Sequence, residues 1–198
     1  INIGTYAIAK INMFLHGLDS ADIQRGDTLA DPKFLNPDGS LKTFDICVAN
    51  PPYSISEWEY EIFKSDKYGR VAGYEMPPTK KADYAFVLHM VKSMNENGRA
   101  GIVLPHGVLF RGGAEGRIRE GLIKNDLIEA IIALPVKLFY GTGIPAAIVI
   151  FNKNKPENHK NKILIIVEHM ESTLYICKTK SYYFNTFFFF QILTILSF

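Results

Sequence analysis

The stretch Asn50-Pro51-Pro52-Tyr53, directly after the apolar run FDICVA, carries the side chains best suited to chemistry. Proline has a fixed φ and no backbone N–H, so this turn is rigid and leaves the carbonyls of Asn50 and Pro51 as free acceptors. Together with the Asn50 side-chain oxygen, they could hold both hydrogens of an exocyclic amino group and localise its lone pair. Tyr53 offers a flat face to the ring that bears the amine. The motif predicts an amine-activating site without metal or general base; the alternative is a rigid proline turn with Tyr53 simply packed.

A second candidate is Asp27, in the segment Gly26-Asp27-Thr28-Leu29. This segment ends a short strand that we expect over Ile23–Leu29, so the carboxylate would stand where a strand finishes. There it could accept a hydrogen bond from a ligand. The alternative is an aspartate that only caps a turn, because aspartate side chains readily bond to backbone N–H groups two or three residues further on.

Histidine and cysteine are placed without the spacing of a metal site. His89 and His106 have no cysteine or acidic ligands at ligand-like intervals, so we read them as structural residues and predict no metal. Cys47 and Cys177 lie far apart, each in an apolar stretch. They indicate a reduced, cytoplasmic compartment, with Cys47 as a buried thiol.

The elements that must position these residues alternate along residues 1–167. Short, continuously apolar strands separated by helices predict an α/β fold with a doubly wound, mainly parallel sheet covered on both faces. We expect strands over residues 23–29, 44–50, 99–105, 128–135, 146–153 and 163–167. We expect helices over residues 5–17, 83–97 and 115–124, and a long loop over residues 54–80. The last two strands lie too close together for a helix between them, so one of them should run antiparallel. Ligands of such sheets bind at the carboxyl ends of strands, where both candidate segments fall.

Composition and charge exclude several classes of protein. The 198 residues hold 22 Lys and Arg against 20 Asp and Glu, a formal net charge of +2, and 47% of them are hydrophobic. This is the composition of a folded domain with a real core, so disorder and a heavily basic nucleic-acid binder are excluded. A slightly basic chain allows nucleic acid as a partner but does not require it.

The composition changes after residue 167. All 15 glycines and all 10 prolines lie within residues 1–167, and residues 168–198 contain neither. Residues 181–198 are uncharged, but Ser, Asn, Thr and Gln interrupt them and no basic flank follows, which argues against a membrane span. We therefore treat residues 1–167 as the functional unit, assign no function to the atypical apolar and aromatic tail 168–198, and expect no membrane partner.

Several motifs resemble one family. FDICVANPPYS resembles the catalytic motif of amino-group methyltransferases that use S-adenosylmethionine. Four further segments, in unbroken order over residues 4–153, resemble the modification (methylase) subunit of type I restriction–modification systems, an adenine-N6 DNA methyltransferase. They are TYAIAKINMFLHG, IQRGDTL, ADYAFVLHMVKSMNENGRAGIVLPHGVLFRGGAEGRIREGLI and LPVKLFYGTGIPAAIVIFNK.

The resemblance implies roles for matching residues. Asn50, Pro51, Pro52 and Tyr53 would form the catalytic loop, with Tyr53 stacking on an adenine flipped out of double-stranded DNA. Asp27 and Asn50 would bind S-adenosylmethionine. The expected partners are double-stranded DNA and the specificity and restriction subunits. Three arginines of the segment FRGGAEGRIR could contact DNA phosphate or a partner, or simply form a solvated basic helix start: Arg111, Arg117 and Arg119.

The chain also departs from this family's pattern. It has no Gly-rich turn of the Asp-Pro-x-x-Gly-x-Gly kind, and no second acidic position for the cofactor ribose precedes the matched segments. We therefore expect a methyltransferase sheet truncated at its N-terminal side, the catalytic half of the domain, that is inactive by itself. Two alternatives stay open: a methyltransferase for another amino group, on glutamine or an RNA base, and a non-catalytic remnant that still binds the specificity subunit.

Overall fold

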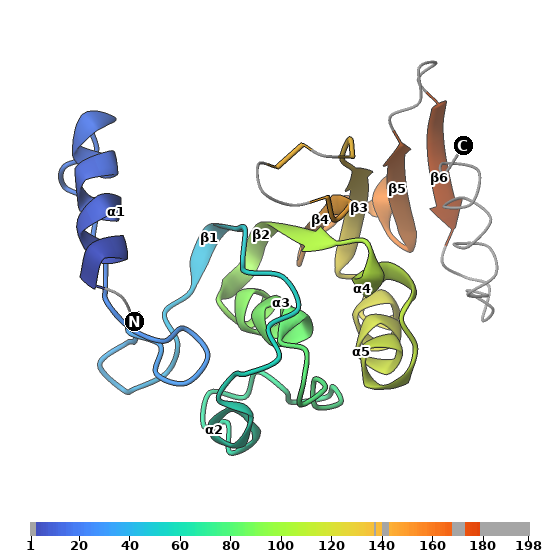
Figure 1. Cartoon of the computed structure of the whole chain (residues 1–198). Coiled ribbons are helices and arrows are strands. Elements are labelled where there is room, and N and C mark those ends of the chain that lie inside the picture. The colour runs from blue at the N-terminus through green and yellow to red at the C-terminus, as the bar shows by residue number, and fades with distance from the viewer. Residues whose placement is uncertain (1–2, 137, 140–142, 168–172, 179–198) are drawn as a thin grey trace.

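A six-stranded sheet forms the centre of the described part of the chain (Figure 1). The computed structural model describes residues 3–136, 138–139, 143–167 and 173–178, the last of these by backbone alone. The strands are β1 (Phe44–Ala49), β2 (Met94–Pro105), β3 (Ile128–Ala133), β4 (Ala146–Asn152), β5 (Lys162–Val167) and β6 (Thr173–Lys178). Their order across the sheet is β1-β2-β4-β3-β5-β6.

The directions of the strands agree with the sequence-based prediction. β1 pairs parallel with β2, and β3 pairs parallel with β5. β4 lies antiparallel between β2 and β3, and β6 runs antiparallel to β5. Strands β1, β2, β3 and β5 therefore point the same way, which confirms the α/β class. The expectation that one of the last two strands is antiparallel is also confirmed, and β4 is that strand.

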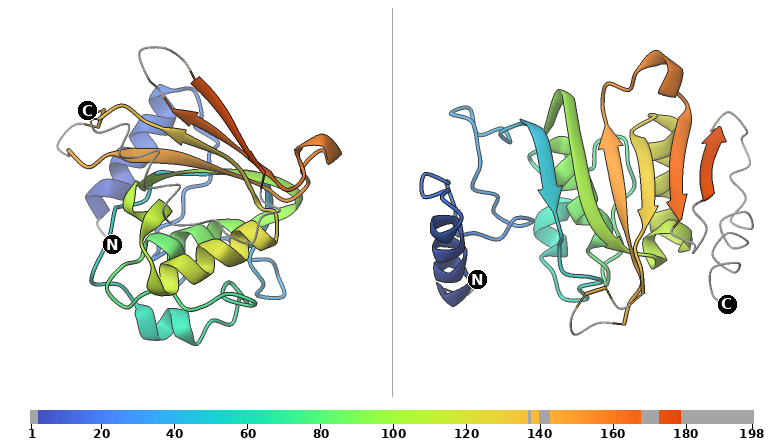
Figure 2. Two further views of the ribbon diagram at one scale, coloured as in Figure 1. Left: turned by 90° about the vertical axis from the view of Figure 1, so that its right-hand side faces the viewer. Right: turned by 90° about the horizontal axis from the view of Figure 1, so that it is seen from above.

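The helices that pack on the sheet lie on one of its faces. The helices are α1 (Ile3–Leu15), α2 (Tyr60–Lys64), α3 (Asp83–Lys92), α4 (Gly107–Phe110), α5 (Gly113–Lys124) and the 3₁₀ turn η1 (Glu157–His159). α3 and α5 lie under the sheet, whereas α1 stands apart beyond the β1 edge (Figure 2). The crossovers from β1 to β2 and from β2 to β3 advance in the same direction, and right-handed crossovers then place both helices on the same face. Within the described residues, the helices therefore cover one face of the sheet, as in one half of a doubly wound fold. The expected cover on both faces is not found there.

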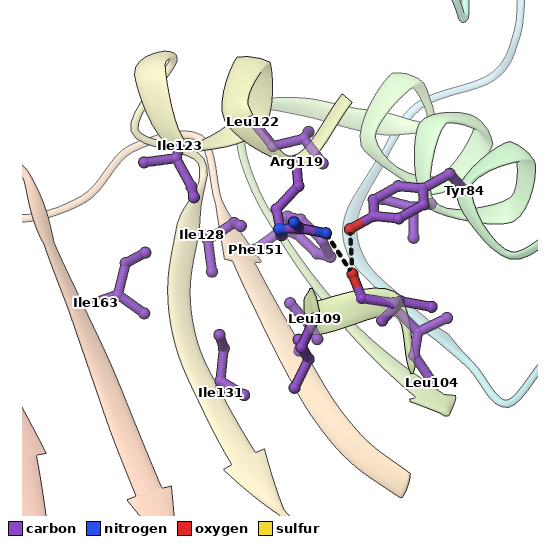
Figure 3. A pocket seen from close by; sticks show the side chains of 13 residues that line it. Tyr84, Leu104, Leu109, Arg119, Leu122, Ile123, Ile128, Ile131, Phe151 and Ile163 are labelled. Carbon is purple, nitrogen blue, oxygen red and sulfur yellow. Dashed lines mark hydrogen bonds between the residues drawn. The ribbon is translucent and has the colours of Figure 1, made fainter. Parts of the chain in front are cut away.

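The main core fills the space between this face and the two helices. Its fully buried members come from α3, α4, α5 and the strands, and they include Leu88, Ile102, Leu104, Ile118, Leu122 and Phe151. A cavity of about 30 Å³ remains between α5 and the sheet, and its lining is almost entirely apolar (Figure 3). A space of that size holds about one water molecule, so it is no site for a cofactor or a base.

The opposite face of β1 is open. Ile46 and Val48 are 75% and 79% exposed, although both belong to the apolar run that predicted the strand. In β2 and β4 the residues that point the same way are also only partly buried, as at Val103 and Ile150. An apolar strand with one uncovered face is typical of a sheet surface that packs against another element.

The loop expected over residues 54–80 contains the short helix α2, and two further element predictions are wrong, each for a local reason. Residues 23–29 form no strand, because the Asp27 carboxylate and carbonyl satisfy the next backbone N–H groups within a turn. The helix that was expected to end at Asn97-Gly98 ends at Lys92, and Gly98 lies inside β2. A Cβ at Gly98 would lie 2.9 Å from the carbonyl oxygen of Phe44, so this glycine permits the close approach of β1 rather than ending a helix.

The tail is described only in part. β6 lies within residues 168–198 and adds an edge strand to β5, so this portion contributes backbone to the sheet. The uncharged segment 181–198 lies outside the described residues. Within the part of the chain that the structure describes, no helix has both the length and the apolar character to cross a bilayer.

Candidate functional site

The Asn50-Pro51-Pro52-Tyr53 turn begins where β1 ends, as predicted. β2 runs parallel to β1 and its last residue is Pro105, so both strands present their carboxyl ends at the same edge of the sheet. The turn therefore lies where ligands of α/β sheets bind. This edge is the candidate active site.

The four residues of the turn differ in their exposure to solvent. Pro51 is buried, Tyr53 is half-buried, and Asn50 and Pro52 are exposed. Within the described part of the chain, no protein group is hydrogen-bonded to the Asn50 side chain, so its amide oxygen is free to accept from a ligand. Partial burial raises the pKa of the Tyr53 hydroxyl. A half-buried ring allows both interpretations, a packed side chain and a stacking surface.

Ser54, directly after Tyr53, has a backbone conformation that serine rarely adopts. Its φ is +49°, in the left-handed region that costs a non-glycine residue free energy. The Asp83 carboxylate holds it there. Asp83 Oδ1 accepts the Ser54 backbone N–H at 2.7 Å, and Oδ2 accepts the Ser54 hydroxyl at 3.2 Å. The first residue of α3 thus anchors the far end of the proline turn.

Asp83 is only 1% exposed, and its charge is balanced by Arg111. Arg111 lies between α4 and α5 and donates through Nη2 to Asp83 Oδ2 at 2.7 Å. Its Nε lies 2.6 Å from Glu115 Oε2, which forms a second ion pair. Burial raises the pKa of Glu115, and the Arg111 guanidinium opposes that rise. The sequence did not reveal this cluster: Asp83 reads as a helix start and Arg111 as a phosphate contact.

The Asp27 side chain caps a turn, which was one of the two interpretations of this residue. Its Oδ1 accepts the N–H groups of Leu29 and Ala30, both at 2.9 Å. The second carboxylate oxygen has no hydrogen-bond partner among the described residues. Capping and ligand binding are therefore compatible at this residue, since they use different oxygens.

A small second core brings the Asp27 turn close to the proline turn. Leu29, two residues after Asp27, packs in one cluster with Ala82 and Ala85 of the α3 region and with Ile55. Ile55 follows Tyr53 by two residues, and its carbonyl accepts the Ala82 N–H. Residues that flank the two candidate segments, which are far apart in sequence, therefore pack in one cluster at the start of α3.

A buried ion pair supports the same region. Arg70 Nε lies 2.8 Å from Asp66 Oδ1, and both side chains are almost fully buried. Arg70 Nη1 also donates to the carbonyl of Leu29 at 2.9 Å, and its guanidinium lies 4.1 Å from the centre of the Phe63 ring. Arg70 thereby ties the Asp27 turn to the long loop that follows Tyr53.

Arg117 and Arg119, like Arg111, have protein partners. Arg119 Nη1 donates to the Val108 carbonyl at 2.8 Å, which also accepts from the Tyr84 hydroxyl (Figure 3). Arg117 is exposed and pairs with Glu75 across the surface. Arg111 and Arg119 thus hold α4 and α5 in place, and Arg117 is the exposed member of the three.

His106 and Cys47 are held by structural contacts. His106 Nε2 lies 2.8 Å from the Ala146 carbonyl oxygen, and burial lowers the pKa of His106. The Cys47 thiol is half-buried, 3.5 Å from the Ser93 carbonyl oxygen, and burial raises its pKa. No group of three His, Cys, Asp or Glu residues in the described ranges is arranged to hold a metal ion.

The fold and the site together define an α/β protein with a polar turn at the carboxyl edge of its sheet, and the comparisons give the family. The model of the N-6 DNA methylase family matches residues 1–182. The MjaVII and MjaVIII type I restriction enzyme methylase subunits of Methanocaldococcus jannaschii are 40% and 42% identical over 83% and 82% of the chain. The chain belongs to the N-6 DNA methylase family. It spans 28% and 29% of the length of these two relatives.

Solved structures agree with this assignment. The methyltransferase subunit of a type I restriction-modification system from Streptococcus thermophilus is 33% identical, with a TM-score of 0.73 over 88% of this chain and 38% of that one. The EcoKI M protein has a TM-score of 0.61 over 84% of this chain and 34% of that one. It is 24% identical, so it supports the fold alone. The segment LFYGTG, part of the sequence resemblance, lies partly outside the described residues.

Proposed function

We propose that this chain contributes the target-amine side of an adenine-N6 DNA methyltransferase, the modification subunit of a type I restriction–modification system. The observation that carries the proposal is the exposed Asn50 amide, free of protein partners in the described structure, at the carboxyl end of β1. Membership of the N-6 DNA methylase family gives that geometry its chemical meaning. The fold alone would not do so, since one fold hosts many activities.

The residues of the turn would act on the amine directly. The Asn50 side-chain oxygen and the Pro51 carbonyl would accept the two amino hydrogens, drawing the nitrogen towards sp³ geometry and localising its lone pair. These bonds strengthen as the nitrogen rehybridises, so they favour the transition state over the ground state. Tyr53 would stack on the adenine ring and fix its orientation.

The residues also fit a role in holding S-adenosylmethionine, which supplies an electrophilic methyl group when bound. Asp27 keeps one carboxylate oxygen available for the amino group of the cofactor's adenine, and Asn50 lies at the carboxyl end of β1. The Leu29 cluster and Arg70 fix this turn, so the acceptor is preorganised.

The substrate in this proposal is double-stranded DNA with the adenine flipped out of the stack, because N6 is paired and buried inside the duplex. A specificity subunit would read the DNA sequence, a restriction subunit would complete the assembly, and the reaction would take place in the cytoplasm. Relatives named as type I methylase subunits support this assignment of partners.

The test is a methyl-transfer assay on the full-length gene product with its specificity subunit and S-adenosylmethionine carrying a labelled methyl group. The substrates are duplex DNA, the same duplex with N6-methyladenine at every adenine, RNA of the same sequence, and a glutamine-containing protein. The proposal expects label at N6 of adenine in the unmodified duplex alone. Label on RNA or on glutamine would show that the substrate is RNA or protein rather than duplex DNA. Label on none of the substrates would indicate a non-catalytic remnant.

A further inference from the structure

The proline turn is held at both ends, and the second anchor lies outside the motif itself. At one end, Ala49 is fixed by its pairing with β2, opposite Ile102. At the other, both hydrogen-bond donors of Ser54 bond to the Asp83 carboxylate. Pro51 and Pro52 have fixed φ values, so the turn between the two anchors has fewer accessible conformations. The conformation at Ser54 therefore restricts where Tyr53 and Asn50 can lie.

Asp83 can hold Ser54 because its own environment is complete. A carboxylate that is 1% exposed requires a partner charge, and Arg111 Nη2 supplies it at 2.7 Å. The Arg111 Nη1 atom lies 3.5 Å from the Ser54 hydroxyl oxygen, so the guanidinium reaches both members of the contact. Without the carboxylate, the left-handed φ of Ser54 would lose the bonds that maintain it.

We infer that Asp83 is a positioning residue for the Asn50–Tyr53 turn, acting through Ser54 and held in place by Arg111. This inference rests on the proposed function for its catalytic consequence, but the positioning itself is a property of this chain. Asp83 touches no reacting atom in this scheme. Its effect is to keep the Asn50 oxygen and the Tyr53 ring at one fixed geometry, as preorganised catalysis requires.

The molecule offers a matched control for this contact. The Asp126 carboxylate also joins a backbone N–H to a cation: it accepts from Asn161 N at 2.9 Å and from Lys155 Nζ at 2.6 Å. Asp126 follows the C-terminal end of α5, at the amino end of β3, on the sheet edge opposite the proline turn. Asp126→Asn therefore makes the same chemical change in a similar contact without touching the turn.

The experiment compares Asp83→Asn with Asp126→Asn in the full-length gene product, using two readouts. The first is hydrogen exchange of the Ser54 backbone amide, which reports the anchor directly. The second is kcat for methyl transfer, per folded protein, with KM for S-adenosylmethionine. We expect Asp83→Asn to speed Ser54 exchange by about tenfold or more and lower kcat by about thirtyfold, with KM within threefold. Asp126→Asn should leave the Ser54 amide and kcat within threefold.

The outcomes separate positioning from general stability and from the function. If Asp83→Asn changes Ser54 exchange and kcat no more than Asp126→Asn does, the inference is wrong. If Asp83→Asn does not fold, Arg111→Lys, which keeps the charge but loses the planar fork, should still raise Ser54 exchange measurably. Wild-type exchange in a folded Arg111→Lys protein would overturn the inference. If the wild-type protein transfers no methyl group, the proposed function fails, and the Ser54 exchange still decides whether Asp83 positions the turn.

Discussion

Acidification should destabilise this fold through His89, a histidine of α3 whose ring is mostly buried. Its Nδ1 has no hydrogen-bond partner among the described residues. Burial lowers the pKa of His89 to about 4, the positive charge of Arg70 adds to that effect, and the negative charge of Asp66 opposes it. The folded state therefore favours the neutral ring more strongly than the unfolded chain does.

The sign and size of this loss of stability follow from the linkage between proton binding and folding. The pKa of the ring is near 6.5 in the unfolded chain and about 4 in the folded one. The associated stability is present above pH 6.5 and is lost progressively as the pH falls towards the folded value. Between pH 7 and pH 5, protonation of the unfolded chain removes about 2 kcal/mol of unfolding free energy through this residue.

Urea unfolding of the wild type and of His89→Gln, at pH 7 and pH 5, measures this contribution. Glutamine does not titrate, so the variant should lose about 2 kcal/mol less than the wild type over that interval. The variant's lower stability at pH 7, from altered packing, cancels in the comparison. Equal losses in the two proteins would refute the buried, neutral state of His89.

Two further substitutions test the stacking surface and the packing of the sheet. Tyr53→Phe should keep most of the methyl-transfer rate, whereas Tyr53→Ala should lose about 1–3 kcal/mol of stacking free energy. Single-turnover kinetics on duplex DNA measures both rates. Equal losses of rate in the two variants would show that the hydroxyl matters. Gly98→Ala should lower the unfolding free energy by about 1–3 kcal/mol, because its Cβ would meet the Phe44 carbonyl oxygen at 2.9 Å. Gly101→Ala, whose Cβ would lie 3.4 Å from the Ile150 side chain, is the control; equal losses in urea unfolding would contradict the close approach at Gly98.

Much of the sheet could be predicted because its signals are local. The apolar run before Pro51-Pro52 defines β1, the short apolar runs 128–135 and 146–153 contain β3 and β4, and the run 163–167 covers β5 except its first residue. The failures arose where one residue type serves two purposes. Asp27 ends the backbone pattern of a strand by bonding to its own turn, and Gly98 looks like a helix stop but serves a close contact with β1.

The sequence predicted the place of Asn50 in the candidate site, but not the contact between Asp83 and Arg111 that supports the turn. The position of Asn50 at a strand end followed from the sequence pattern, because a strand must stop at two prolines. The contact between Asp83 and Arg111 joins residues 28 positions apart, and it depends on how α3 and the α4–α5 turn meet. An arginine beside two glycines predicts a phosphate contact as readily as a buried ion pair, so only the structure distinguishes them.

The most direct test of the central claim is the methyl-transfer rate of Asn50→Ala on adenine-containing duplex DNA, with Asn158→Ala as the control. Asn158 is an exposed asparagine in η1, which precedes β5 and so lies at the opposite edge of the sheet. Loss of one acceptor that strengthens in the transition state should raise the barrier by about 2–4 kcal/mol, which is about 30- to 1,000-fold in rate. The account predicts that loss for Asn50→Ala, with the fold and the affinity for S-adenosylmethionine nearly unchanged, and a normal rate for Asn158→Ala. An Asn50→Ala rate within threefold of the wild type would contradict it.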